Sequence, residues 1–239
     1  MKKGVGIAIA VALGVAAASW IYHDRQQPSF EQQLDTALGS MPVWQVIKEQ
    51  DPAFRKKIQD ETAAMQKAGK SEQEIIDALQ PQILRLQMTR LQNAPDANVV
   101  EYMKLNMEQT AAMQKVSDDS CFRFLYPEIK GGVNPMRLLD KGLMERRMQA
   151  DAEMMRAAFG PNKHKVTPAE VKRAENDVLP IMQKLDDKYG EDIELLQNPR
   201  KAVGKEKLSC NLVQELWSNV LELPEENAAG VIRYAVSDL

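Results

Sequence analysis

Aromatic residues are scarce in this sequence, and their scarcity bears on the fold class. Phe, Trp and Tyr together make up 5% of the 239 residues, whereas Met alone occurs 13 times. Sheet cores are enriched in aromatic and β-branched side chains, while Leu, Met and Ala favour helices. Apolar residues at 44% and charged residues at 27% are ordinary for a folded chain. The composition therefore predicts a folded, all-α protein.

Histidine is also rare, which leaves little material for the common catalytic sites. The chain contains only His23 and His164, and none of the motifs GxSxG, HExxH, GxGxxG or GxxxxGKS/T. His164 lies in a polar loop, PNKHK, and nothing marks a partner serine, so we expect its ring to be solvated. The enzyme interpretation then depends on paired carboxylates, as in glycoside hydrolysis, and the 34 acidic residues do not single out a pair.

The sequence has no excess of positive charge, which argues against nucleic-acid binding. The chain has 31 Lys and Arg against 34 Asp and Glu, a formal net charge of -3. Proteins that bind nucleic acid present a basic surface. We therefore expect no nucleic-acid partner.

The longest run without charge lies at the N-terminus. Val5 to Tyr22 has neither charge nor Pro and is about 18 residues long, close to the minimum that crosses a bilayer. Lys2 and Lys3 precede the run and favour a cytoplasmic N-terminus, so the rest of the chain would lie outside. We predict a signal-anchor helix over residues 1–26 in the bacterial inner membrane, followed by a single helical periplasmic domain over residues 27–239.

A cleaved signal peptide is the alternative interpretation of the same segment. Ala16, Ala17 and Ala18 satisfy the small-residue rule for a cleavage site, with Ser19 as the new N-terminus. Against cleavage, the apolar run continues beyond this point through Trp20 to Tyr22. We expect the anchor to be retained, and in either case the domain is exported.

Small residues recur along the predicted anchor at the spacing that lets two membrane helices pack closely, as Gly6, Ala10, Gly14 and Ala18. Every even-numbered position from Gly4 to Ala18 is Gly or Ala, so some such pattern was bound to occur. The pattern therefore gives self-association only weak support.

Two cysteines, Cys121 and Cys210, are the whole cysteine content of the chain. They form no CxxC pair, which argues against a thioredoxin-like or zinc-ribbon site. An even number of cysteines in an exported chain favours a disulfide. We predict a Cys121–Cys210 bridge that ties the middle of the chain to its C-terminal part; two buried thiols are the alternative.

Helix signals recur through the rest of the chain, and alternation at period two is missing. Ser71 with Glu74 and Thr167 with Glu170 have the spacing of capping boxes, and Pro168 stands at a first helical position. Further helix starts are marked at Ser29, Asp51, Asp96, Asn134, Ser209 and Pro224. The pattern predicts a multi-helix globular bundle of about eight to ten helices, with one long helix from Asn134 to Gly160.

The segment SCFRFLYPEIKGGVNP, residues 120–135, interrupts this pattern because it is aromatic and rich in Gly and Pro. We interpret it as a long ordered loop held by Cys121. Its aromatic residues Phe122, Phe124 and Tyr126 either fill one end of the bundle or contact a partner; filling the bundle is the interpretation we favour.

Methionines cluster at helical spacing, as in Met103 with Met107 and Met144 with Met148. Core packing is the simplest explanation. An adaptable groove for a partner helix, with Met144 and Met148 as contacts, is the second, and a Cu(I) site the third. Copper carriers usually combine denser Met with His or Cys, so we expect no metal and no cofactor.

Together these observations favour protein–protein binding as the function. The protein would act as an inhibitor or immunity-type protein, or as an assembly factor of an envelope machine, with its partner in the periplasm or the inner membrane. A periplasmic cell-wall hydrolase that uses paired carboxylates is the alternative.

The state of the N-terminus gives the first testable prediction. We expect the mass of full-length protein, tagged at its C-terminus and purified from membranes, to include Met1, because the apolar run extends beyond the cleavage motif. A mass that corresponds to a chain starting at Ser19 would show that the segment is a signal peptide.

Overall fold

The computed structural model describes residue 39 and residues 41–237, and this part of the chain is all-helical, as predicted. It contains eleven α-helices and two 3-10 helices, with no strand among the residues described. No helix in this part combines the length and the apolar character that a membrane crossing requires. The predicted anchor, Val5 to Tyr22, and the predicted helix after Ser29 lie outside the described residues.

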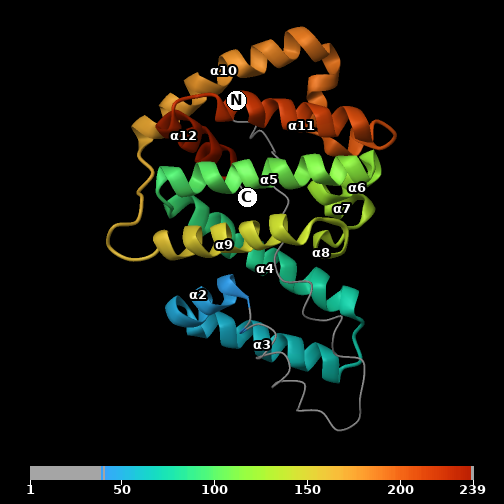
Figure 1. Cartoon of the computed structure of the whole chain (residues 1–239), viewed down its shortest axis with the longest axis vertical. Helices are drawn as coiled ribbons and strands as arrows, with labels where there is room; N and C mark the ends of the chain where they lie inside the picture. The colour runs from blue at the N-terminus through green and yellow to red at the C-terminus, as the bar shows by residue number, and fades with distance from the viewer. Residues whose placement is uncertain (1–38, 40, 238–239) are drawn as a thin grey trace.

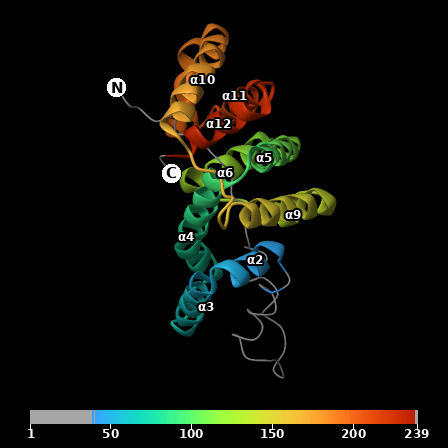
Figure 2. The same cartoon turned by 90° about the vertical axis from the view of Figure 1, so that its left-hand side faces the viewer.

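The helices are stacked along the long axis of the molecule and form two groups, called here the lower layer and the upper layer; Figures 1 and 2 show one group above the other. The lower layer contains α2 (Pro42–Gln50), α3 (Pro52–Lys67), α4 (Glu72–Asn93) and α9 (Lys141–Ala157). The upper layer contains α5 (Asp96–Val116), α6 (Asp118–Leu125), α10 (Pro168–Tyr189), η2 (Gly190–Leu196), η3 (Pro199–Ala202), α11 (Glu206–Leu221) and α12 (Glu225–Ala235). The short helices α7 (Pro127–Lys130) and α8 (Pro135–Leu138) lead from α6 back to α9.

Helix α5 lies at the centre of this arrangement. It packs against α6, α11 and α12 of the upper layer and against α9 of the lower layer. Its buried side chains include Tyr102 and Met103, neither of which is exposed to solvent. On the other side of α9, α2 completes the lower layer with Trp44 and Ile47.

One connected cluster of buried apolar side chains runs through both layers, from Val43 to Val236. Trp217 on α11 is the largest of its fully buried side chains. Burying a large apolar side chain contributes about 1.5–3 kcal/mol, so a core low in aromatics obtains its stability from many Leu, Val and Met contacts. Of the methionines at helical spacing, Met103 belongs to this cluster and Met107 packs against it, while Met144 is buried outside the cluster and Met148 is half-buried.

The capping signals in the sequence are realised at helix starts. Ser71 forms a complete capping box: its hydroxyl accepts from Glu74 N–H, and the Glu74 carboxylate accepts from Ser71 N–H at 2.9 Å. Thr167 forms half of one, since its hydroxyl accepts from Glu170 N–H. The Glu170 carboxylate instead pairs with side chains from elsewhere in the chain.

The segment predicted as a long loop, residues 120–135, is largely helical, and this prediction was wrong. Ser117 accepts a hydrogen bond from Ser120 N–H and starts α6, and α7 follows after Tyr126. The loop interpretation overlooked that Ser117 caps a strongly amphipathic turn whose aromatic residues face the core. Within this segment, Tyr126 and the Gly-containing stretch 131–134 are not helical.

The long helix predicted from Asn134 to Gly160 is also interrupted. Asn134 caps only the short α8, which ends at Leu138, and Asp140 then caps α9 by accepting from Leu143 N–H at 3.1 Å. The second cap, two residues after the end of α8, redirects the chain before α9 begins. By contrast, Pro81 and Pro180 lie inside α4 and α10, which continue through them.

Cys121 on α6 and Cys210 on α11 form the predicted disulfide. Their sulfurs are 2.09 Å apart, the Cα atoms are 6.3 Å apart, and both residues are fully buried. The bridge closes a loop with a sequence separation of 89 residues and joins two helices of the upper layer.

Replacing both cysteines, as Cys121→Ser with Cys210→Ser, should lower the free energy of unfolding by about 4 kcal/mol, because the unfolded chain regains the entropy of a long loop. Urea unfolding followed by circular dichroism measures this loss. Reduction of the wild-type protein is the control and should lower its free energy of unfolding by a similar amount. If complete reduction left the melting temperature of the wild-type protein unchanged, the prediction would be contradicted.

Candidate functional site

The structure places the predicted partner-binding residues mainly in the core. Phe122 is fully buried, Phe124 is 5% exposed and Tyr126 is 3% exposed. The Phe122 and Tyr126 rings pack with their centroids 5.1 Å apart, and burial raises the pKa of Tyr126 to about 12. These side chains belong to the buried apolar cluster, in agreement with the packing role that we favoured.

The two methionines proposed as partner contacts lie on α9. Met144 is 1% exposed, and its sulfur accepts a hydrogen bond from Gln109 Nε2 at 3.2 Å, while Met148 is half-buried. In this conformation Met144 offers no surface to a partner. That the three aromatic residues and the two methionines bind a partner protein stays a prediction.

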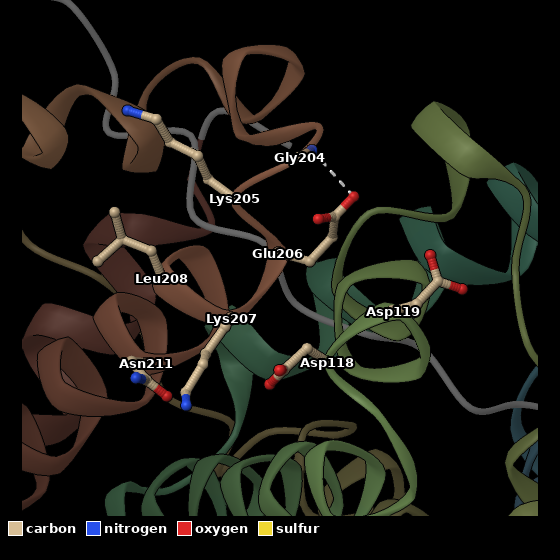
Figure 3. A pocket seen from close by; sticks show the side chains of 8 residues that line it. All are labelled: Asp118, Asp119, Gly204, Lys205, Glu206, Lys207, Leu208 and Asn211. Atoms are coloured by element: carbon tan, nitrogen blue, oxygen red, sulfur yellow. Dashed lines mark hydrogen bonds between the residues drawn. The ribbon is translucent and has the colours of Figure 1, made fainter.

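The surface at the start of α6 contains an open hollow of about 500 Å³. One wall comes from the start of α6, and the other comes from the turn before α11 and its first residues, as Figure 3 shows. The residues that line it are Asp118, Asp119, Gly204, Lys205, Glu206, Lys207, Leu208 and Asn211. The hollow therefore joins two segments that are far apart in sequence.

Three connections hold the two walls together. The disulfide lies beneath them, since Cys121 follows Asp119 by two residues and Cys210 precedes Asn211. Gln114 on α5 donates from Nε2 at 2.9 Å to both Asp118 and Asn211. A separate connection at the rim comes from α7.

Lys130 on α7 provides the rim connection, because its ammonium group contacts both Asp119 and Glu206 Oε1, the latter at 2.9 Å. Glu206 also accepts from Gly204 N–H at 3.0 Å, the bond drawn in Figure 3. Gly204 has φ +90, a conformation that favours glycine. The Gly204 N–H and then Lys130 lower the pKa of Glu206 to about 2, so this carboxylate is ionised and occupied.

Lys205 and Lys207 give the hollow basic groups as well. Lys205 pairs with Asp192 at 2.7 Å, whereas Lys207 is exposed. Within the part of the chain that the structure describes, no group of three or more His, Cys, Asp or Glu residues could hold a metal ion. The chemistry that the hollow offers is charge pairing and hydrogen bonding at a stiff surface.

His164 differs from the expectation of a solvated loop residue, which was wrong. It does lie in a loop, but its side chain is only 27% exposed, and its Nε2 is 2.8 Å from Glu170 Oε2. Its backbone N–H also donates to Asn93 O at 2.8 Å. The sequence spacing placed His164 outside a helix but could not show which carboxylate the fold brings to it.

Glu170 belongs to a buried charge cluster that sequence reasoning missed. The Arg233 guanidinium on α12 contacts Glu170 Oε1 at 2.9 Å, Asp96 Oδ1 at 2.7 Å and the carbonyl of Ala94 at 2.6 Å. The Arg233 side chain is 1% exposed. The cluster, here called the Arg233 clamp, consists of Arg233, Glu170, Asp96, Ala94 and His164, and no local pattern reveals it because its members come from distant segments.

A second buried charge pair lies between α5 and α9. Arg147 Nε is 2.8 Å from Asp151 Oδ1, and both side chains are 0% exposed. The guanidinium stands over the Tyr102 ring, 4.1 Å from its centroid, and Arg147 Nη1 is 3.5 Å from Gln109 Oε1. Burial raises the pKa of Asp151, with Arg147 opposing this effect. The i, i+4 spacing of the pair on the apolar face of α9 was a signal that could have been found.

No family model, no curated protein and no solved structure matches this chain. Its function is therefore argued from its own residues.

The low pKa of Glu206 predicts a pH dependence for the hollow. Because the folded-state pKa is below the unfolded value, the stabilisation is present above pH 4.5 and is lost as the pH falls towards 2. Glu206→Gln should remove up to about 1 kcal/mol of stability near neutral pH, given the screening of surface charges, and almost none near pH 2.

Urea unfolding at a series of pH values measures this difference, with Glu191→Gln as the control at an exposed glutamate. If the free energies of unfolding of the wild type and Glu206→Gln differed by the same amount at every pH, the lowered pKa of Glu206 would be contradicted.

Proposed function

We propose that this protein is tethered to the bacterial inner membrane by residues 5–22 and binds another protein with its periplasmic domain. It would act as an inhibitor or immunity-type protein, or as an assembly factor of an envelope machine. The surface around the hollow between α6 and α11 is the proposed contact.

The observation that carries this proposal is the cross-linking of the hollow. Its two walls are fixed by the Cys121–Cys210 bridge, by Gln114 and by Lys130. A surface that is already rigid loses less conformational entropy when a partner binds, so more of the contact energy appears as affinity. Hydrogen bonds and charges fixed in this way also favour one partner over others.

The composition and shape of the hollow suit a protein partner. Acidic and basic groups surround Leu208 in the hollow. The exposed Val203 directly precedes one lining segment, and the exposed Val116 lies two residues before the other. Val116 is 49% exposed and Val203 is 55% exposed. A mixture of apolar and charged groups on an open surface is typical of protein interfaces, whereas small-molecule sites usually enclose their ligand.

Two features support the proposed compartment. A joined cysteine pair is typical of oxidising compartments such as the periplasm. The apolar run from Val5 to Tyr22, preceded by Lys2 and Lys3, has the pattern of a signal-anchor.

The hydrolase alternative has less support at the hollow. A general acid needs a carboxyl group with a raised pKa, but the pKa of Glu206 is lowered and Asp119 pairs with Lys130. Burial does raise the pKa of one carboxyl group, that of Asp151, but its side chain is 0% exposed and so is out of reach of a polysaccharide.

Membrane purification of the full-length tagged protein, with mass spectrometry of the proteins that co-elute, tests the proposal. We expect one stoichiometric partner. Lys207→Glu, which reverses a charge in the hollow, should reduce its recovery about tenfold or more, since losing rim complementarity and adding like-charge repulsion costs on the order of 1.4 kcal/mol or more. Lys172→Glu on α10 makes the same change in net charge at another exposed lysine and should leave recovery unchanged.

Equal loss of the partner in both variants would show that net charge, and not the hollow, controls binding. A protein without partners that digests cell-wall material would favour the hydrolase instead.

A further inference from the structure

The two layers of the fold are joined mainly along one seam, the contact between α5 and α9. Helix α9 packs against α5 on one side and against α2 on the other, and Figures 1 and 2 show it directly below α5. The two helices run antiparallel: Gln109 on α5 contacts Met144 on α9, while Tyr102, earlier on α5, contacts Arg147, later on α9.

This seam is held by polar groups that are incompletely satisfied. The Arg147–Asp151 pair is fully buried, and Arg147 Nη2 and Asp151 Oδ2 make no hydrogen bond within the described residues. Buried charges stabilise a fold less than well-packed apolar residues of the same volume. When such a seam opens, water can bond to these atoms, which lowers the cost of opening.

The disulfide does not hold this seam closed. Cys121 and Cys210 lie on α6 and α11, which both belong to the upper layer. The chain itself passes between the layers at the α4–α5 junction, through the α7–α8 connection and through residues 158–167.

Two of these three passages lie at the same end of the seam and are fixed there by the Arg233 clamp. Arg233 contacts Ala94 and Asp96 at the α4–α5 junction, and His164 of the 158–167 segment contacts Asn93 and Glu170. This end, at the left of Figure 1, holds the start of α5 and the end of α9.

The opposite end of the seam is held more loosely. The chain there passes through Gly131, which has φ +77, and Gly132, and the carbonyls of both glycines accept hydrogen bonds from the half-buried Arg123. The ion pair across the seam at this end, Arg146 with Glu108, is exposed on both sides. Exposed pairs of this kind contribute little to stability.

We propose that the α5–α9 seam is a hinged joint: the lower layer turns about the Arg233 clamp, and the seam opens at the α8 end. Opening hydrates Arg147 and Asp151 and exposes Met144. The joint opens without unfolding the disulfide-linked upper layer. This inference does not depend on the proposed partner or on the hollow.

Native-state hydrogen exchange of the full, disulfide-intact protein, followed by peptide mass spectrometry, tests the joint. Amides of α9 and α2 should exchange about tenfold or more faster than those of α11 and α12. Once α9 separates from α5, α9 and α2 lose packing that keeps them helical, and such sub-global opening requires less free energy than global unfolding. Equal protection of α9 and α11 in the wild-type protein would overturn the proposal.

The variant Arg147→Met with Asp151→Leu replaces the buried charges with apolar side chains of similar size. It should slow exchange in α9 about tenfold and leave α11 unchanged. Arg146→Met, at the neighbouring exposed arginine, is the matched control and should change exchange by less than about twofold. Exchange in α9 that is as fast in the apolar variant as in the wild type would show that the polar groups do not govern the joint.

Discussion

The buried guanidinium of Arg233 is the interaction on which the arrangement of the two layers depends. It comes from the last helix and holds the N-terminal turn of α10 through Glu170 and the α4–α5 junction through Asp96 and Ala94. An arginine can form several such contacts at once, because its planar group carries five donors. Removing one partner of a buried charge pair typically costs about 3–5 kcal/mol, so the clamp strongly constrains where these segments can lie.

The molecule combines a stiff end with a more compliant seam. Around Cys121 and Cys210, covalent and ionic cross-links converge on the hollow that we propose as a binding surface. Along α5 and α9, the contact depends on a buried charge pair with incomplete hydrogen bonding. The proposed binding surface and the proposed joint lie in different parts of the fold. A partner bound at the hollow therefore need not disturb the contact between α5 and α9.

The core explains why buried polar groups have a structural role here. Met is unbranched and flexible, so a core rich in Met and poor in aromatics specifies its packing less strictly than one of Phe, Leu and Ile. The cluster of Tyr102, Gln109, Arg147 and Asp151 adds directional contacts between α5 and α9. Such contacts fix the register of two helices even where they contribute little net stability.

The sequence by itself determined the helical class and the capping of helices at Ser71 and Thr167, because these depend on composition and short spacing. It favoured the pairing of its two cysteines but left two free thiols as the alternative, and the fold brings the two sulfurs together. Only the tertiary structure decided where the His164 side chain lies and that Glu170 faces Arg233. The hollow is a tertiary feature for the same reason, since it joins residues that are more than eighty positions apart. Local patterns record what one helix needs to form, whereas contacts between distant segments depend on how all the helices pack.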